Sequence, residues 1–326
     1  MVDLRVADPT WRPSASQSAR VARAEMLARV RAHFAAQQVL EVETPLLSHA
    51  GTTDPNIGSA RVRCGAIDGY LQTSPEFAMK RLLADGCGDC YQIARVFRAG
   101  ERGARHNPEF SLLEWYRVGF SLADLVDDTL AVLEAALGKA MPATQLSFAG
   151  ACRERGGFDP IDADVEAMRA ALTAAGAALP VGLGDDEVDG WIDLAFSTLV
   201  ASTFAADAVT VVSGYPASQA SLAKVVEGDA GPVALRAEVY VGALELGNGF
   251  EELLDADEQL ERFQSERAAR LAAGRDAPPV DQHLIAALRA GMPACSGMAL
   301  GLDRVLMVAL GETDIDAVLN FPWGRA

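Results

Sequence analysis

The spacing of apolar side chains predicts a long amphipathic helix near the start of the chain. Between residues 19 and 38, Leu27, Val30 and Phe34 recur at the spacing of one helical face. The short apolar run at residues 39–42 then reads as a strand. It should end there, because a proline three residues later cannot donate to a strand ladder. The pattern therefore predicts a helix followed by a short strand.

Cap and turn residues mark further elements. Ser74 and Pro75 are the capping serine and first-turn proline typical of a helix start, and that helix is predicted to run to about Asp85. Further helices are predicted at residues 122–137, 164–176, 187–205, 255–273, 281–290 and 302–310, and strands at 90–97, 110–118, 209–212 and 235–246. A glycine-rich turn is predicted directly before the last of these helices. The run of helices predicts a helical insertion at about 122–205, and no linker or repeat marks a domain boundary.

Composition excludes several classes of protein. The chain has 326 residues, of which half are apolar, so we expect a globular protein with a large core. It contains no run of about 20 apolar residues that could cross a membrane. The N-terminus lacks the basic start and apolar core of a secretory signal. We therefore expect a cytoplasmic protein with no membrane partner.

The net charge and the cysteine count argue against nucleic-acid binding, a disulfide framework and a cysteine metal site. The net charge of −17 opposes the basic footprint on which most nucleic-acid-binding proteins depend. Five cysteines are an odd number for a disulfide framework. Cys87 and Cys90 form one CxxC pair, but no second pair or paired histidines accompany it. We interpret these cysteines as ordinary thiols.

The segment from Val96 to Tyr116 carries the first clear chemistry. An apolar run ends at Arg98, a loop rich in glycine and arginine follows, and a second apolar run contains Glu114 and Tyr116. Strand side chains repeat every two residues, so Glu114 and Tyr116 should share one face of a hairpin. Such a hairpin offers a cation for a phosphate and a carboxylate for an amine on one sheet surface.

This hairpin resembles the second signature motif of class II aminoacyl-tRNA synthetases, specifically of their lysine branch. The helix and strand at residues 19–42 resemble the first motif of that family. The segment Ser296–Arg304 resembles the third, in which glycines let the backbone approach the nucleotide. Two further segments, Tyr70–Glu76 and Leu244–Glu252, occur in the family's order, so the resemblance covers nearly the whole chain.

The resemblance implies a fold and an assembly. The expected fold class is α+β, with an antiparallel sheet flanked by helices. Residues 1–326 should form a single catalytic domain that contains the helical insertion. A homodimer is also implied, because the first motif builds the dimer interface in that family.

The resemblance also implies an ATP site. Arg98 and Arg304 match arginines that hold the phosphates and are the implied catalytic residues, while Glu245 matches a carboxylate that binds Mg²⁺. The implied ATP site consists of Arg98, Ala99, Gly100, Glu101, His106, Asn107, Glu245, Leu246, Gly301 and Arg304. Attack of a substrate carboxylate on the α-phosphate needs positioning and charge stabilisation but no protein nucleophile.

The implied amino-acid pocket is rich in carboxylates. It consists of Ser74, Pro75, Glu76, Glu114, Tyr116, Asn248, Phe250 and Glu252. A lysine-type substrate brings two ammonium groups, and truncating one member of a buried charge pair typically costs about 3–5 kcal/mol. Three glutamates from separate segments suit such a diamine and would repel aspartate. The alternative is that these glutamates form structural salt bridges.

Two positions depart from the family's pattern. Gly100 stands where the second motif usually has a glutamate that contacts adenine, and Glu101 lies one place later. Glu101 or backbone atoms would then have to read the adenine. Ala299 stands where lysyl-tRNA synthetases generally have glycine. Its methyl group would shift the backbone amine of the substrate, which is compatible with a β-amino acid.

The N-terminal region bears on the acceptor. About 18 residues precede the first predicted helix, too few for the anticodon-binding domain found there in lysyl-tRNA synthetases. We therefore expect no N-terminal anticodon-binding domain and no tRNA partner. Over its full length the chain resembles stand-alone synthetase paralogues that attach (R)-β-lysine to bacterial elongation factor P. The segments Tyr215–Ala223 and Gly291–Gly297 carry this closer resemblance.

The expected function follows from this resemblance. It is ATP-dependent activation of (R)-β-lysine, or lysine, as an adenylate, and transfer to a lysine ε-amine of elongation factor P. Three alternatives stay open: an enzyme that charges tRNA, a class II paralogue that makes a small amide, and a regulatory paralogue without enzymatic activity.

Overall fold

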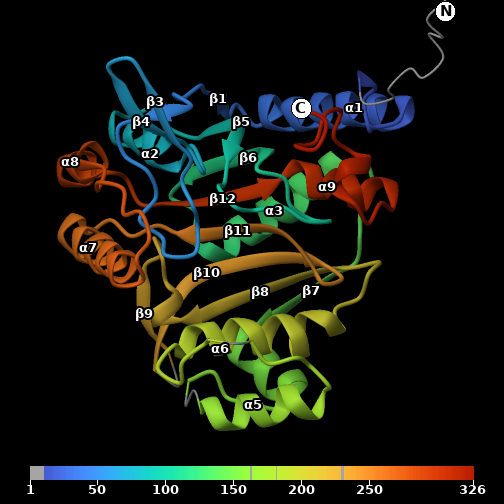
Figure 1. Ribbon diagram of the computed structural model, residues 1–326. Coiled ribbons are helices and arrows are strands. Elements are labelled where there is room, and N and C mark those ends of the chain that lie inside the picture. Colours follow the sequence, from blue (N-terminus) through green and yellow to red (C-terminus); the bar gives the residue numbers. More distant parts are fainter. Residues whose placement is uncertain (1–10, 162–163, 181, 229–230) are drawn as a thin grey trace, which may run out of the picture.

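The computed structural model describes residues 11–161, 164–180, 182–228 and 231–326 and has a large sheet at its centre (Figure 1). In order across this sheet, the strands are β1 (Leu40–Glu41), β5 (Cys90–Phe97), β6 (Glu109–Val118), β12 (Cys295–Gly301), β11 (Leu244–Glu251), β10 (Gly231–Val241), β8 (Val209–Pro216) and β7 (Ala143–Ser147), with β9 (Val225–Gly228) beside β10. In this order, each pair of adjacent strands from β5 across to β8 is antiparallel, and β9 is antiparallel to β10. The outermost pairs, β1–β5 and β7–β8, are parallel. The expected antiparallel sheet in an α+β fold is confirmed.

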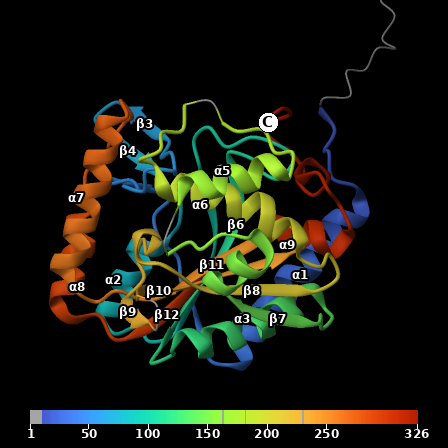
Figure 2. The same ribbon diagram turned by 90° about the horizontal axis from the view of Figure 1, so that it is seen from below.

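Helices surround the sheet in three groups, each with a buried apolar cluster. The first group is α1 (Gln17–Ala36), α3 (Leu122–Leu137) and α9 (Leu302–Leu310). The second is α2 (Glu76–Ala84), α7 (Ala256–Ala272) and α8 (Gln282–Gly291), of which α7 and α8 follow one edge of the molecule in Figure 2. The third is α4 (Phe148–Ala151), α5 (Val165–Ala174) and α6 (Val188–Ala195).

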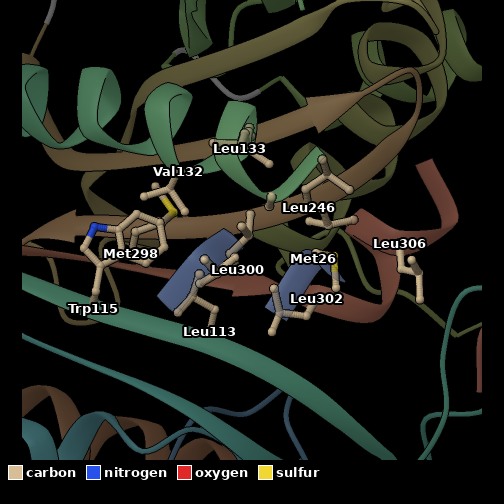
Figure 3. Close-up of a cluster of buried hydrophobic side chains, with 14 of the residues drawn as sticks. Met26, Leu113, Trp115, Val132, Leu133, Leu246, Met298, Leu300, Leu302 and Leu306 are labelled. Carbon is tan, nitrogen blue, oxygen red and sulfur yellow. The ribbon is translucent and has the colours of Figure 1, made fainter. Parts of the chain in front are cut away.

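Strand alternation sorts the central side chains between the core and the opposite face of the sheet. Leu113 and Trp115 of β6 pack with Met298 and Leu300 of β12 in the cluster under α3 (Figure 3). Burying each of these side chains contributes roughly 1.5–3 kcal/mol to folding. The residues between them, such as Glu114, must then point to the other face. Packing of the core therefore fixes which side chains are available for chemistry.

A second, small sheet lies beside the large one. It has the order β2 (Leu47–Ser48), β4 (Ile67–Leu71) and β3 (Arg61–Cys64), all antiparallel. Helix α2 follows it, and the Ser74 hydroxyl accepts a hydrogen bond of 2.9 Å from the Glu76 N–H at the predicted helix start. The N-terminal helix, strand β5 and the final helix also lie where the sequence predicts them.

Several predicted elements differ from the structure. The segment predicted as one strand at 235–246 is a hairpin of β10 and β11, because Gly242 has a φ of +55° and reverses the chain. The glycine-rich stretch expected as a turn before the last helix is strand β12, in which Met298 and Leu300 alternate with small residues.

The span expected to be a helical insertion, about 122–205, also contains a strand. Residues Ala143–Ser147 form β7, which extends the large sheet by pairing with β8. The helix predicted at 187–205 ends as α6 at Ala195 and continues as a π-helical turn, Phe196–Val200, and a 3₁₀ turn, Ala201–Thr203. None of the described helices is long and apolar enough to span a membrane.

Candidate active site

A cleft of about 1850 Å³ opens on the face of the sheet opposite the α3 cluster. Of the residues predicted for the site, those that line this cleft are Ser74, Pro75, Glu76, Arg98, Glu101, His106, Asn107, Glu245, Leu246, Asn248, Phe250, Gly301 and Arg304. Glu114, Tyr116 and Glu252 are buried behind its wall, and Ala99 and Gly100 lie outside its lining. The fold thus brings four separate predicted segments to one place.

Arginines form one end of the cleft. Arg304 at the start of α9 lies 2.7 Å from the His106 Nε2, donates to the Glu245 carbonyl oxygen at 2.8 Å, and lies 3.8 Å from the Glu245 carboxylate. Burial and the Arg304 charge lower the pKa of His106, so this imidazole is neutral and accepts from the guanidinium. This end is suited to an anion such as a phosphate.

Arg98 at the end of β5 has spare hydrogen-bonding capacity. Its guanidinium lies over the Phe110 ring at 5.1 Å and 3.9 Å from the Glu101 carboxylate. The Nε atom is buried and has no hydrogen-bond partner. Buried donors are normally paired, so this one is available to a bound ligand.

Two residues that were predicted to contact the nucleotide, Gly100 and Asn107, have other structural roles. Gly100 has a φ of +85°, in the left-handed region that favours glycine, which explains why the glutamate of the family's pattern is missing here. Asn107 is engaged at both ends of its amide: it donates to the Glu109 carbonyl at 2.6 Å and accepts from the Trp323 N–H at 2.9 Å. Asn107 therefore fastens the C-terminal segment to the hairpin.

A second carboxylate, absent from the sequence prediction, lines the cleft near Glu245. Glu238 on β10 accepts hydrogen bonds from Tyr215 at 2.7 Å, Arg236 at 2.5 Å and Tyr240. Desolvation and the nearby Glu238 raise the pKa of Glu245, although Arg304 opposes the shift. Oxygen ligands of this kind are those that Mg²⁺ prefers, and a divalent cation would relieve their repulsion. The residues present therefore fit a magnesium ion.

Glu114 is held by two hydroxyl groups in the buried part of the site. The Ser74 hydroxyl donates to one carboxylate oxygen at 2.6 Å, and the Tyr116 hydroxyl donates to the other at 2.8 Å. Burial and the neighbouring Glu76 raise the pKa of Glu114 to about 8. The predicted shared face of Glu114 and Tyr116 is confirmed by this contact.

Lys80, which the sequence analysis left without a role, lies between the other two glutamates. Its Nζ is 2.7 Å from Glu76 and 2.5 Å from Glu252. Burial and Glu76 raise the pKa of Glu252 to about 8, against the effect of Lys80. The spacing of Glu76 and Lys80 by one helical turn was the signal available in the sequence. The alternative of structural salt bridges thus holds in part for Glu76 and Glu252.

Glycine and alanine on β12 make room for these side chains. A Cβ atom on Gly297 would lie 2.3 Å from a Tyr116 ring carbon and 3.0 Å from Glu252, so only glycine fits. Ala299 lies opposite Asn248 on one neighbouring strand and Glu114 on the other. The methyl group of Ala299 therefore stands between two residues of the predicted amino-acid pocket.

Comparison with known proteins agrees with this geometry. Residues 3–325 match the family model described as tRNA synthetases class II (D, K and N). Proteins named elongation factor P–(R)-β-lysine ligase are similar over the whole chain: that of Vibrio cholerae is 42% identical over 97% of this chain and 98% of its own. Those of Salmonella dublin and Yersinia enterocolitica are 41% and 42% identical, each over 97% of this chain and 98% of their own. The chain belongs to the class II tRNA synthetase family and, within it, to the elongation factor P–(R)-β-lysine ligases.

Proposed function

We propose that this protein is an ATP-dependent ligase that joins (R)-β-lysine to a lysine ε-amine of elongation factor P. The observation that supports this most strongly is the convergence of Glu76, Glu114 and Glu252 beside a cleft whose other end carries Arg98 and Arg304. A diamine with a carboxylate matches that distribution of charge. The family and the names of the similar proteins support the same reaction.

The reaction has two steps. An oxygen of the amino-acid carboxylate attacks the α-phosphorus of ATP, and pyrophosphate leaves. The neutral ε-amine of the acceptor then attacks the carbonyl carbon of the adenylate, loses a proton, and releases AMP as the amide bond forms. The carboxylate cluster would hold the amino groups of the substrate, while Arg98 would orient its carboxylate and the α-phosphate.

The nucleotide residues act mainly through charge. Arg98 and Arg304 would stabilise the charge that develops on the phosphates, and the neutral His106 keeps the Arg304 guanidinium in place. Glu245, with Glu238 beside it, would hold Mg²⁺, which supplies charge neutralisation for the pyrophosphate that leaves. Leu246 and Gly301 would border the nucleotide. Because Gly100 has no side chain to contact adenine, the neighbouring Glu101 or backbone atoms would do so.

The molecule that accepts the activated amino acid distinguishes this function from its alternatives. We expect purified enzyme with ATP and labelled (R)-β-lysine to transfer label to elongation factor P and not to lysine tRNA. The control uses elongation factor P whose acceptor lysine is replaced by arginine. Label on tRNA alone would contradict the proposal, and a labelled small amide would favour the synthesis of a free metabolite.

Three further parts of the proposal derive from the family resemblance. We infer a single catalytic domain over residues 1–326, a cytoplasmic location, and a homodimer that forms through α1 and β1. Val21 on α1 and Leu40 on β1 are exposed by 47% and 52%, which is consistent with an apolar contact at this surface.

A further inference from the structure

Lys80 lies at the centre of the carboxylate cluster, yet the reaction outlined above gives it no role. Only 1% of its surface is exposed, and lysine is almost never fully buried unless it is paired. Its Nζ contacts Glu76 at 2.7 Å and Glu252 at 2.5 Å. One internal ammonium thus neutralises part of a site that is proposed to bind ammonium groups.

The two partners of Lys80 come from different parts of the fold. Glu76 begins α2, one helical turn before Lys80, and Glu252 directly follows β11. The Glu252 N–H donates to the Cys295 carbonyl at 3.0 Å, which fixes the backbone there. Two carboxylates bonded to one ammonium would repel each other if that ammonium were removed. Glu114 needs no such cation, because Ser74 and Tyr116 hold it.

We propose that Lys80 is a positioning residue of the amino-acid pocket, whose ammonium keeps the carboxyl groups of Glu76 and Glu252 adjacent so that they can receive an ammonium group of the substrate. Lys80 acts through these carboxylates and does not bind the substrate itself. The inference rests on the proposed function, because it concerns recognition of a diamine substrate by the same pocket.

Loss of the Lys80 charge has a specific consequence for proton uptake. The titratable groups around the pair are Glu76, Glu114, Tyr116, Glu252, Cys295 and Glu266. None of these groups is a cation, so loss of the Lys80 ammonium would raise the pKa of Glu252 further above about 8. A protonated carboxyl group forms no ion pair, and the substrate would have to displace that proton when it binds.

The test is diamine-dependent ATP–pyrophosphate exchange by wild-type enzyme and Lys80→Met between pH 7 and 9. At pH 7 we expect the KM for (R)-β-lysine to rise about 30-fold, as for loss of one member of a buried pair, and the KM for ATP to change less than about threefold. Between pH 8 and pH 9 the variant's KM should fall up to about tenfold, because its Glu252 still releases a proton there. The wild type's KM should fall only about twofold to threefold, because the pKa of its Glu252 is about 8.

Two comparisons separate positioning from a general structural role. Lys224 also pairs with a glutamate, Glu251 at 2.9 Å, but its side chain is 50% exposed, so Lys224→Met should leave both KM values unchanged. Lys80→Arg keeps the charge and should keep the wild-type pH dependence, even if the larger side chain raises the KM.

Each outcome has a defined meaning. If Lys80→Met raises the KM equally at every pH, or if Lys80→Arg gains the steeper dependence, the inference is wrong. If Lys80→Met does not fold, the double variant with Glu252→Gln, which removes the charge pair together, is measured instead. It should show wild-type pH dependence, and a steeper one would overturn the inference. Wild-type enzyme that shows no exchange with (R)-β-lysine would refute the proposed function instead.

Discussion

At the scale of single residues, Glu114 shows how the fold buries an ionisable group of the site at a cost in stability. It is 2% exposed, and both of its oxygens accept hydrogen bonds from hydroxyl groups. Burial and Glu76 raise its pKa to about 8, far above that of a glutamate in an unfolded chain. The folded protein therefore binds a proton that the unfolded chain releases between about pH 4.5 and pH 8.

Replacing Glu114 by glutamine should separate stability from substrate recognition. The sign follows from linkage: the native state binds more protons over that interval, so Glu114 lowers the free energy of unfolding increasingly as the pH rises. At pH 8 and without ligand, we expect the free energy of unfolding of Glu114→Gln to be about 1 kcal/mol higher than that of the wild type. Diamine-dependent exchange should meanwhile fall at least about 30-fold, with little change in the KM for ATP.

Thermal unfolding at pH 5 and pH 8 and the two KM values check this prediction. At pH 5 the stability gain should disappear, because Glu114 is then protonated in the native state and largely ionised only in the unfolded one. Equal losses in the KM for ATP and for the diamine would count against the role assigned to Glu114.

Residues on regular strands could be predicted, whereas those that depend on tertiary contacts could not. The alternation of β6 is enough to place Glu114 and Tyr116 on one face. The spacing of Glu76 and Lys80 indicates that these two can pair, but Lys80 and Glu238 reach the site only through the docking of α2 and the β10–β11 hairpin. Conversely, Asn107 stands at the sequence position expected for a nucleotide contact, but its side-chain amide accepts a hydrogen bond from the C-terminal segment.

At the scale of elements, the loop between β5 and β6 depends on the end of the chain. Asn107 accepts from the Trp323 N–H, and His106 beside it supports Arg304. We expect Asn107→Ala to loosen the C-terminal segment and to raise the KM for ATP about threefold to tenfold, as for loss of a buried hydrogen bond. The KM for the diamine should change little. Hydrogen exchange of the amides after Leu319 and steady-state kinetics measure the two effects.

The matched control is Asn320→Ala, because Asn320 is exposed in the same C-terminal segment. It should alter neither exchange nor kinetics. Unchanged protection of the Trp323 amide in Asn107→Ala would show that the hydrogen bond does not fasten the segment.

The prediction of elements was wrong where a tertiary contact decides which of two local conformations a segment adopts. Residues 143–147 form a strand because β8 offers them an open edge, although helices precede and follow them. The small residues of β12 suggest a turn, but they are the ones that fit between Tyr116, Glu252 and the neighbouring strands. Helices α1 and α9 were predictable because apolar side chains recur on one face of each helix.

At the scale of the whole molecule, one aspartate that lines the cleft joins three distant segments. Asp303 on α9 pairs with Arg23 on α1 and accepts from the Ser111 N–H of β6 at 2.7 Å. Arg23 also donates to the Val318 carbonyl at 3.1 Å. A carboxylate that is 1% exposed thus joins a side chain of the first helix, a backbone N–H of the central hairpin and the last helix.

Replacing Asp303 by asparagine should therefore weaken the entire fold and not one local element. Asparagine keeps the shape but leaves the Arg23 guanidinium without its countercharge, and breaking a buried pair in this way costs about 3 kcal/mol. For a chain of this size we expect the Tm to fall by about 5 °C or more in a single cooperative transition. Asp257 pairs with Arg289 at 2.8 Å on the surface, and Asp257→Asn should cost less than about 1 kcal/mol. If the two variants unfold at the same temperature, the buried junction does not hold the three segments together.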